Sequence, residues 1–343
     1  MRVMTEKPLN AETPVKRLRS WITANDVFFD RNQGQIPDEK MPLEKWELVI
    51  DGEVKKSLRL NFQQICDLPK AIVSNTLECS GNGRSMLARK ASGNPWTIGG
   101  VGNAIWGGVG LSVLLSEAGL TERAAHVSFE GMDTPLGKAN IKFVRSIPID
   151  KAMASTLLAY EMNGEPLPLK HGYPLRALAL GWTGANCVKW LNRITVLDKP
   201  YEGFFMDKVY RVIQKGQDPL TGEIISQIKL KSIFTQPLPG EQRQTGRIVV
   251  LGAAYAGEEH VEKVEVSTDN GTTWQGAEFI GPDEPFAWRH WQFIWQAAQT
   301  GKHTLLSRAT DSRGRRQPET AEWNLLGYGN NGTQEHAITI DIV

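Results

Sequence analysis

Hydrophobic positions over residues 45–225 switch repeatedly between strand-like and helix-like spacing. The run from Trp46 to Ile50 is apolar and ends at Asp51-Gly52, as a strand does before a turn. Residues 110–119 instead carry apolar side chains at helical spacing and close with a glycine. Because strands and helices do not alternate regularly, the pattern predicts an α+β domain, which we place over residues 1–227.

From about Ile228 the pattern changes to short alternating runs, such as 247–251 and 261–267, joined by turn signals that include Asp269-Asn270-Gly271. Residues 228–343 are therefore predicted to form an immunoglobulin-like antiparallel β-sandwich. A small sandwich attached to a larger domain often serves assembly, so we expect a homodimer. The tryptophans expected in its core and contact face are Trp274, Trp288, Trp291, Trp295 and Trp323.

Composition and charge narrow the class of protein. The 343 residues are 41% hydrophobic and 22% charged, which is ordinary for a soluble globular chain. With 39 Lys and Arg against 38 Asp and Glu, the net charge of +1 gives no global field for nucleic acid or anionic membrane. Any cationic site must be local. No apolar run approaches the roughly 18 residues of a membrane span.

The N-terminal segment up to Trp21 is polar, contains Pro8 and Pro14, and has no apolar core of signal-peptide length. The expected location is therefore the cytoplasm for the sequence as written. It would be the periplasm if an export signal precedes this segment.

Cys79 is the first candidate for chemistry. It follows the apolar, β-branched run that ends at Glu78, and it precedes small turn residues and Arg84. A cation and turn N–H groups favour the thiolate, which binds soft metals or attacks electrophiles. Taken alone, the local sequence favours a small buried hydrophobe. The chain's three cysteines are far apart and lack CxxC spacing, which argues against a disulfide scaffold or a cysteine-rich zinc site.

Several segments of the first domain place polar or cationic residues beside glycine or proline turns, at 28–33, 130–133, 171–176 and 184–190. With Cys79 and Arg84 they resemble the molybdenum-cofactor domain of the sulfite oxidase family, which includes sulfite dehydrogenases and a domain of plant nitrate reductase. Segments 158–168 and 323–327 extend the resemblance through most of the chain. It implies a molybdopterin-binding catalytic domain followed by a β-sandwich dimerisation domain.

The resemblance also implies a set of cofactor residues. Cys79 matches the cysteine of the family's C-A-G-N-R-R motif, whose thiolate ligates molybdenum. Cationic side chains suit the phosphate of the pterin cofactor. Taken alone, Asp133 fits a turn former and His171 a capping or core histidine. The implied cofactor-binding residues are Phe29, Arg31, Asn32, Gln33, Asp133, His171, Arg176, Asn186, Cys187, Val188 and Lys189.

For the substrate, the resemblance implies that Arg31 and Arg84 converge on a small oxyanion and that Tyr210 is the active-site tyrosine. Plain interior packing is the other explanation for Tyr210. Cationic or aromatic positions of the family pattern are also replaced here, by Gly83, Gln33, Leu326, Asn186 and Cys187. Fewer cations should weaken the capture of sulfite, so the identity of the substrate is less well supported than that of the cofactor.

The implied reaction is oxygen transfer at an oxo-molybdenum centre, which oxidises sulfite to sulfate. The sequence contains no CxxCH, b5-like haem, flavin or nicotinamide pattern, so the electrons are expected to leave to a separate acceptor, such as a c-type cytochrome or dioxygen. The alternatives are another sulfur oxyanion or a sulfoxide as substrate, a cysteine-nucleophile hydrolase with His171 or His126 as base, and a binding or structural protein.

Overall fold

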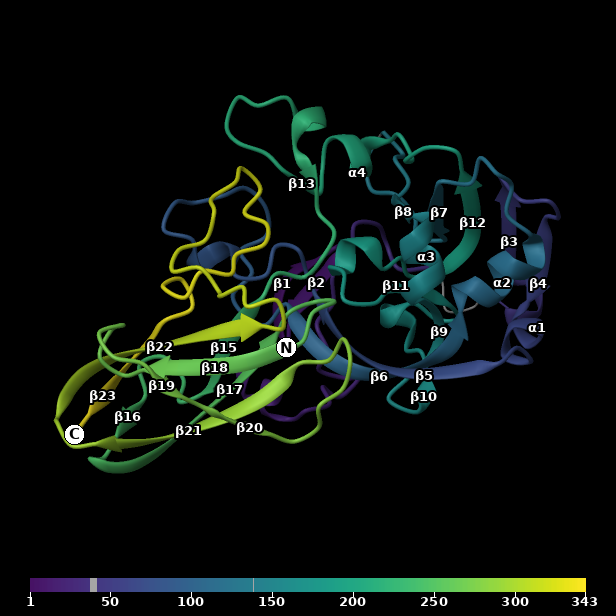
Figure 1. Cartoon of the computed structure of the whole chain (residues 1–343). Helices are drawn as coiled ribbons and strands as arrows, with labels where there is room; N and C mark the ends of the chain where they lie inside the picture. The colour runs from purple at the N-terminus through teal and green to yellow at the C-terminus, as the bar shows by residue number, and fades with distance from the viewer. Residues whose placement is uncertain (38–41, 138) are drawn as a thin grey trace.

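The computed structural model describes residues 1–37, 42–137 and 139–343. Its α+β part and its β-sandwich lie side by side, with the C-terminus at the far end of the sandwich (Figure 1). This arrangement confirms the predicted fold class. Within the described ranges, no helix combines the length and apolar character needed to cross a bilayer.

The α+β part contains antiparallel and mixed sheets. In the described residues one sheet has the order β10 (Glu165–Pro166), β9 (Thr156–Met162), β6 (Val101–Gly110), β5 (Lys70–Glu78), with β11 (Arg176–Ala179) also paired to β9. A second sheet has the order β4 (Leu58–Asn61), β3 (Glu47–Gly52), β12 (Leu191–Leu197), β7 (His126–Gly131), β8 (Val144–Pro148), and only β3 and β12 run parallel in it.

Short helices and hairpins complete this part. The helices are α1 (Phe62–Cys66), α2 (Leu111–Ala118), α3 (Ile149–Ser155) and α4 (Phe204–Asp207), and the hairpins pair β1 (Arg2–Glu6) with β2 (Leu9–Glu12) and β13 (Arg211–Val212) with β14 (Glu223–Ile224). The 3-10 turns are η1 (Val15–Arg19), η2 (Leu43–Lys45), η3 (Arg84–Met86), η4 (Leu169–His171), η5 (Gly184–Asn186) and η6 (Pro219–Thr221).

Helix α2 shows why the sequence pattern was informative. Leu111, Leu114, Leu115 and Ala118 lie on one face and are buried in the core. Gly119 ends the helix with φ +68°, a left-handed conformation that glycine adopts without steric strain. The predicted helix over 110–119 and the predicted strand over 46–50 are both confirmed.

The sandwich consists of facing sheets. One has the order β15 (Lys231–Gln236), β17 (Gly246–Tyr255), β21 (Arg289–Ala297), β20 (Glu278–Ile280), and the other has the order β16 (Gln242–Arg243), β23 (Ile338–Ile342), β22 (Gly301–Asp311), β18 (Val261–Ser267), β19 (Gln275–Gly276). Side chains of both sheets form one core, which includes Trp291 of β21 and Leu305 of β22. The short β16 pairs with β23 in parallel, so the sandwich is not wholly antiparallel.

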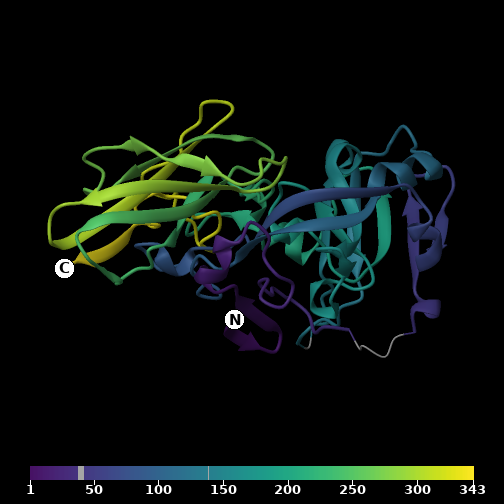
Figure 2. The ribbon, with the colours of Figure 1, turned by 90° about the horizontal axis from the view of Figure 1, so that it is seen from below.

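Segments from each end of the chain cross between the two parts. Leu18 of η1 packs in a cluster with Ile233 and Ala253 of the sandwich, and the purple N-terminal segment lies at the junction in Figure 2. Residues 312–337 leave the sandwich and lie against the segment after β5, where Gly329 N–H donates to the Ser80 carbonyl at 2.9 Å. Trp323 belongs to this excursion, with Arg89 3.7 Å from its ring. The division at residues 227 and 228 stays a prediction.

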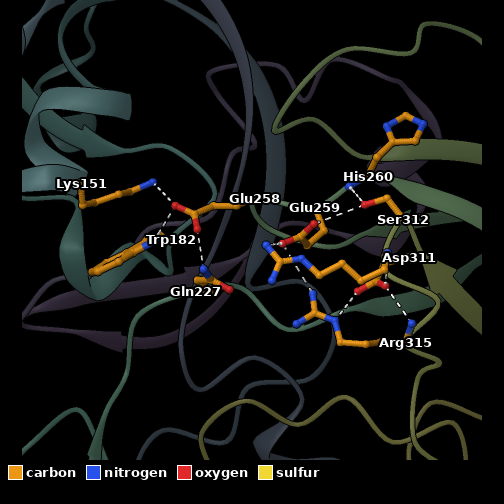
Figure 3. Close-up of polar contacts among 10 residues, drawn as sticks. Lys151, Trp182, Gln227, Glu258, Glu259, His260, Asp311, Ser312 and Arg315 are labelled. Atoms are coloured by element: carbon orange, nitrogen blue, oxygen red, sulfur yellow. Dashed lines mark hydrogen bonds and ion pairs between the residues drawn. The ribbon is translucent and has the colours of Figure 1, made fainter.

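The side chain of Glu258, between β17 and β18, bonds across the junction. Its carboxylate accepts hydrogen bonds from Lys151 of α3, from Trp182 Nε1 at 3.0 Å and from Gln227 (Figure 3). Close backbone contact accompanies it, because a Cβ on Gly181 would come within 2.8 Å of the Gly257 backbone. Glu258 thus fixes the sandwich against the α+β part.

Candidate active site

The end of strand β5 positions Cys79. The strand stops at Glu78, and Cys79 is 7% exposed. The following turn is held by the Asn82 N–H, which donates to the Cys79 carbonyl at 2.8 Å, and by Asn82 Oδ1, which accepts from Gly100 N–H at 2.9 Å. Burial raises the pKa of the Cys79 thiol, although Arg31 and Arg84 oppose this shift. The cations therefore favour the thiolate as expected, but in the protein alone desolvation outweighs them.

Segments far apart in the sequence meet around this cysteine. They come from the loop after β2, the end of β7, the η4–β11 region, the η5–β12 region and the segment after α4. Of the residues predicted to serve the site, those that line one common pocket, called here the cofactor pocket, are Phe29, Arg31, Asn32, Gln33, Cys79, Asp133, His171, Arg176, Cys187, Lys189 and Tyr210.

The cations of the cofactor pocket lack carboxylate partners. Arg176 is 3% exposed; its Nη1 donates to the His171 carbonyl at 2.8 Å and its Nε has no partner. Lys189 donates to Asn32 Oδ1 and to the Lys170 carbonyl. Burial lowers the pKa of Lys189 to about 7, with Arg176 adding to the shift, and burial lowers the pKa of Arg176 to about 10. Neither side chain forms an ion pair with a described carboxylate.

This donor set fits the expected cofactor. Enclosed cations with an unpartnered N–H call for an anion, and a phosphate supplies one with several acceptor oxygens. Cys79 lines the same pocket and offers the sulfur donor that a soft metal requires. Asp133 also lines it, and burial raises the pKa of its carboxyl group. The residues present could therefore hold a molybdenum pterin group with its phosphate at Arg176 and Lys189.

Tyr210 occupies a strained position. Its φ of +52° is uncommon for a residue other than glycine, and such strain concentrates at functional sites. Its ring stacks on Tyr328 with centroids 5.5 Å apart. Its hydroxyl oxygen accepts from Gln33 Nε2 at 2.7 Å and from Arg31 Nη2 at 3.5 Å. With the oxygen used as an acceptor, the hydroxyl proton is available to a ligand.

His171 supports the pocket wall. Its Nε2 lies 3.0 Å from the Asn25 carbonyl and its Nδ1 lies 3.6 Å from Asp30 Oδ1. Burial, with Lys189 and Lys170 adding to it, lowers the pKa of His171 well below the ordinary value, so the ring is neutral. The described hydrogen bonds pair no histidine with Cys79, and His126 does not line the pocket. The hydrolase alternative lacks its base.

Arg84, Asn186 and Val188 do not line the cofactor pocket. Arg84 donates Nε to the Leu326 carbonyl at 2.7 Å and Nη1 to the Asn94 carbonyl at 2.8 Å, so its guanidinium ties loops together. Val188 is 1% exposed and lies in the core. A direct contact of these residues with substrate or cofactor stays a prediction.

Sequence reasoning missed Arg145 on β8. This buried guanidinium donates Nη2 to Asn186 Oδ1 at 3.0 Å and lies 5.3 Å from the Tyr210 ring. A charge between the apolar residues Val144 and Ile147 was the available signal, because such residues are rarely buried without a partner. Ser80, Phe143 and Trp190 also line the pocket and were not singled out.

Comparisons with known proteins agree with this geometry. Residues 33–205 match the oxidoreductase molybdopterin binding domain, and residues 222–341 match the Mo-co oxidoreductase dimerisation domain. Mitochondrial sulfite oxidase of Rattus norvegicus is 35% identical over 100% of this chain and 66% of its own length. The chain thus spans just under two thirds of that relative.

Other relatives are covered more fully. Sulfite oxidase of Gallus gallus is 34% identical over 95% of this chain and 75% of its own length. The solved sulfane dehydrogenase SoxCD of Paracoccus pantotrophus is 28% identical, with a TM-score of 0.86 over 100% of this chain and 90% of that one. Together with the domain matches, these similarities show that the chain belongs to the sulfite oxidase family of molybdenum-cofactor oxidoreductases.

Proposed function

We propose that this chain oxidises sulfite to sulfate in the cofactor pocket and passes the electrons to a separate acceptor. The observation that carries the proposal is that Cys79, Arg31 and Tyr210 line one pocket together with Arg176 and Lys189. The bound cofactor would supply the oxygen-transfer and electron chemistry. Sulfite oxidation is also the activity in the names of the rat and chicken relatives.

Each side chain has a distinct task in this proposal. Cys79 holds the metal as a thiolate, while Arg176 and Lys189 hold the cofactor phosphate. Arg31, whose Nη2 is 3.5 Å from the Tyr210 hydroxyl, supplies the cation next to the substrate. Tyr210 donates its free hydroxyl proton to an oxygen of the oxyanion. Gln33 and Arg145 keep the Tyr210 side chain in place: Gln33 bonds its hydroxyl, and Arg145 lies over its ring.

The partners follow from the same family likeness. In this proposal the electrons pass to a separate acceptor, such as a c-type cytochrome or dioxygen. The match of residues 222–341 to a dimerisation domain supports a homodimer. An analytical ultracentrifugation run at micromolar protein would distinguish a dimer from a monomer.

Metal analysis combined with turnover tests the function. Protein from a molybdate-fed, cofactor-competent host is assayed for molybdenum and for sulfite-dependent reduction of ferricyanide or cytochrome c, as wild type, Cys79→Ser and Cys66→Ser. Cys66 is the control because it lies on α1 and does not line the pocket. We expect molybdenum and turnover in wild type and Cys66→Ser, and loss of turnover in Cys79→Ser. If the wild type contains molybdenum but does not turn over sulfite, the assignment of the cofactor stands and sulfite is overturned as the substrate.

A second substrate class has its own support. Leu326 stands where vertebrate members of the family carry an arginine, and the nearby Arg84 is engaged by backbone carbonyls. Another sulfur compound, such as a sulfur oxyanion, a sulfoxide or the sulfane substrate in the name of SoxCD, therefore remains the alternative. Comparing kcat/KM for sulfite and thiosulfate in the same assay, with a sulfoxide reduction assay beside it, separates these substrates.

A further inference from the structure

A second pocket lies where the sandwich meets the α+β part. It is called here the junction pocket, and the lining residues used below are Ser80, Gln227, Lys229, Arg315, Arg316 and Tyr328. Gln227, Asp311 and Arg315 of its wall are visible in Figure 3, beside the Glu258 contacts. None of the residues assigned to the cofactor above lines this pocket.

One layer of side chains separates the junction pocket from the cofactor pocket. Ser80, the residue after the metal-binding cysteine, lines both pockets, and its hydroxyl donates to Thr183 Oγ1 at 3.0 Å. Tyr328 lines the junction pocket while its ring stacks on Tyr210, which lines the cofactor pocket. Tyr328 therefore lies between the junction pocket and Tyr210.

Tyr328 forms the end of the junction pocket that is nearest to the cofactor pocket. Its ring is packed by Tyr210 and by the Arg84 guanidinium, 5.3 Å from the ring centre. Its backbone is fixed by Asn324, which bonds both the Tyr328 N–H at 2.9 Å and the carbonyl at 2.8 Å. In the described residues the Tyr328 hydroxyl has no hydrogen-bond partner, although the residue is only 6% exposed. The phenol is rigidly held with its donor unused.

Three cations and three carboxylates line the junction pocket, but two of the carboxylates are already paired. Arg315 is neutralised by Asp311 at 2.7 Å, and Glu78 by Lys231 at 2.6 Å. Lys229 and Arg316 form no ion pair with any described carboxylate. The Lys229 chain lies over Gly329, because a Cβ there would come within 3.1 Å of Lys229 Cε and 3.5 Å of Nζ. Glu223 also lines the pocket and is exposed to solvent.

We infer that the junction pocket is a binding site for a small dianionic oxyanion, held by Lys229 and Arg316 with the Tyr328 hydroxyl at its inner end. The inference rests on the proposed function, in which both substrate and product are such ions. It also accounts for cations missing around Leu326 and Gly83: the local positive charge lies at the domain junction instead. In a chain of net charge +1, this local field concentrates the dianion next to the catalytic pocket.

Sulfate binding at equilibrium tests the site without turnover. Sulfate is titrated calorimetrically into the cofactor-loaded enzyme at low ionic strength, as wild type, Lys229→Met/Arg316→Gln and Tyr328→Phe. The control is Arg247→Gln/Lys302→Met, which removes the same charge from exposed sandwich positions that have no ion pair with a described carboxylate. We expect about tenfold weaker binding in the double variant and a loss of roughly fivefold in Tyr328→Phe, with the control unchanged.

Sulfate affinity in the double variant equal to that of the control would overturn the inference, and so would an absence of sulfate binding by the wild type. Because Lys229 and Arg316 lie outside the core, the double variant should unfold at the wild-type temperature, which is checked first. Crystals soaked in sulfate give a second measurement, with density expected between Lys229 and Tyr328. Failure of sulfite turnover with normal sulfate binding would count against the proposed function alone.

Discussion

Two lysines, Lys231 in the interior and the half-buried Lys189 in the wall of the cofactor pocket, have opposite surroundings. Lys231 is 1% exposed, and its Nζ lies 2.6 Å from Glu78 Oε1, which also accepts from Tyr255 and Asn82, each at 2.9 Å. Lys189 donates only to the neutral oxygens of Asn32 and Lys170. At the junction the protein supplies the counter-charge itself, whereas in the cofactor pocket it leaves that charge to a ligand.

The contrast explains why the sandwich matters to the active site. Lys231 and Tyr255 belong to β15 and β17 of the sandwich, and Glu78 directly precedes Cys79, the proposed metal ligand. The sandwich thereby holds the end of β5 in place. A buried ion pair is strongly coupled to its surroundings, because either partner alone would be an uncompensated charge.

The largest effect on stability is expected from removing Lys231, the lysine paired with Glu78. Lys231→Met leaves the Glu78 carboxylate buried without its cation and should lower the free energy of unfolding by about 3–5 kcal/mol. Urea denaturation followed by fluorescence measures it, with Lys302→Met as the exposed control. The double variant Glu78→Gln/Lys231→Met should recover much of the loss. A loss below about 1 kcal/mol in the single variant would contradict the role given to this pair.

Lys189, which has no ion pair with a described carboxylate, should make the free energy of unfolding depend on pH. In cofactor-free protein Lys189 has a pKa of about 7, whereas an ordinary lysine titrates at 10.5. Between these values the unfolded chain binds the extra proton, so stability should rise with pH by up to about 1.4 kcal/mol per pH unit, less where the pocket admits water. Below pH 7 this contribution should level off.

Lys189→Met removes the titrating group and should flatten that rise while abolishing cofactor retention. Urea denaturation of the cofactor-free protein at pH 7, 8 and 9 measures the slope. Equal slopes in wild type and variant would show that Lys189 keeps its ordinary pKa, and the contrast with Lys231 would then disappear.

The smallest effect is expected at the half-exposed junction contact. Glu258→Gln keeps an acceptor for Trp182 but loses the charge that faces Lys151, and the Glu258 side chain is 28% exposed. Because water screens this pair, the loss should be about 1 kcal/mol or less. Thermal unfolding compares it with Glu262→Gln, an exposed residue of β18. A loss as large as that of Lys231→Met would show that exposure does not separate the two contacts.

Much of the site was accessible from the sequence because its residues sit in short motifs. The cofactor-pocket residues at 29–33 and 187–189 lie beside turns in segments that resemble the sulfite oxidase family, and that resemblance implied a common ligand for them. The position of Cys79 at a strand end was predicted from the local pattern and is confirmed. Its protonation was not, since local cations are visible in the sequence and burial is not.

Other features depend on contacts between distant segments. The side chain of Arg84 reaches Leu326, 242 residues away, and Tyr328 stacks on Tyr210. Arg145 looked like an ordinary strand residue until the structure set its guanidinium over the Tyr210 ring. None of these pairings has a local signature.

The sequence by itself determined the α+β character of the first part and the β-rich character of the second, because periodicity and turn chemistry are local properties of the chain. The residues of the cofactor pocket came from the resemblance of short motifs to the sulfite oxidase family. Only the tertiary structure decided which charges the protein satisfies internally and which it leaves for ligands. Lys231 and Lys189 are both lysines near apolar runs, and they differ in whether a carboxylate from another strand lies within reach. The packing of distant segments sets how deeply a charged side chain is buried and whether it has a partner, and these two factors decide the free-energy cost of burying the charge.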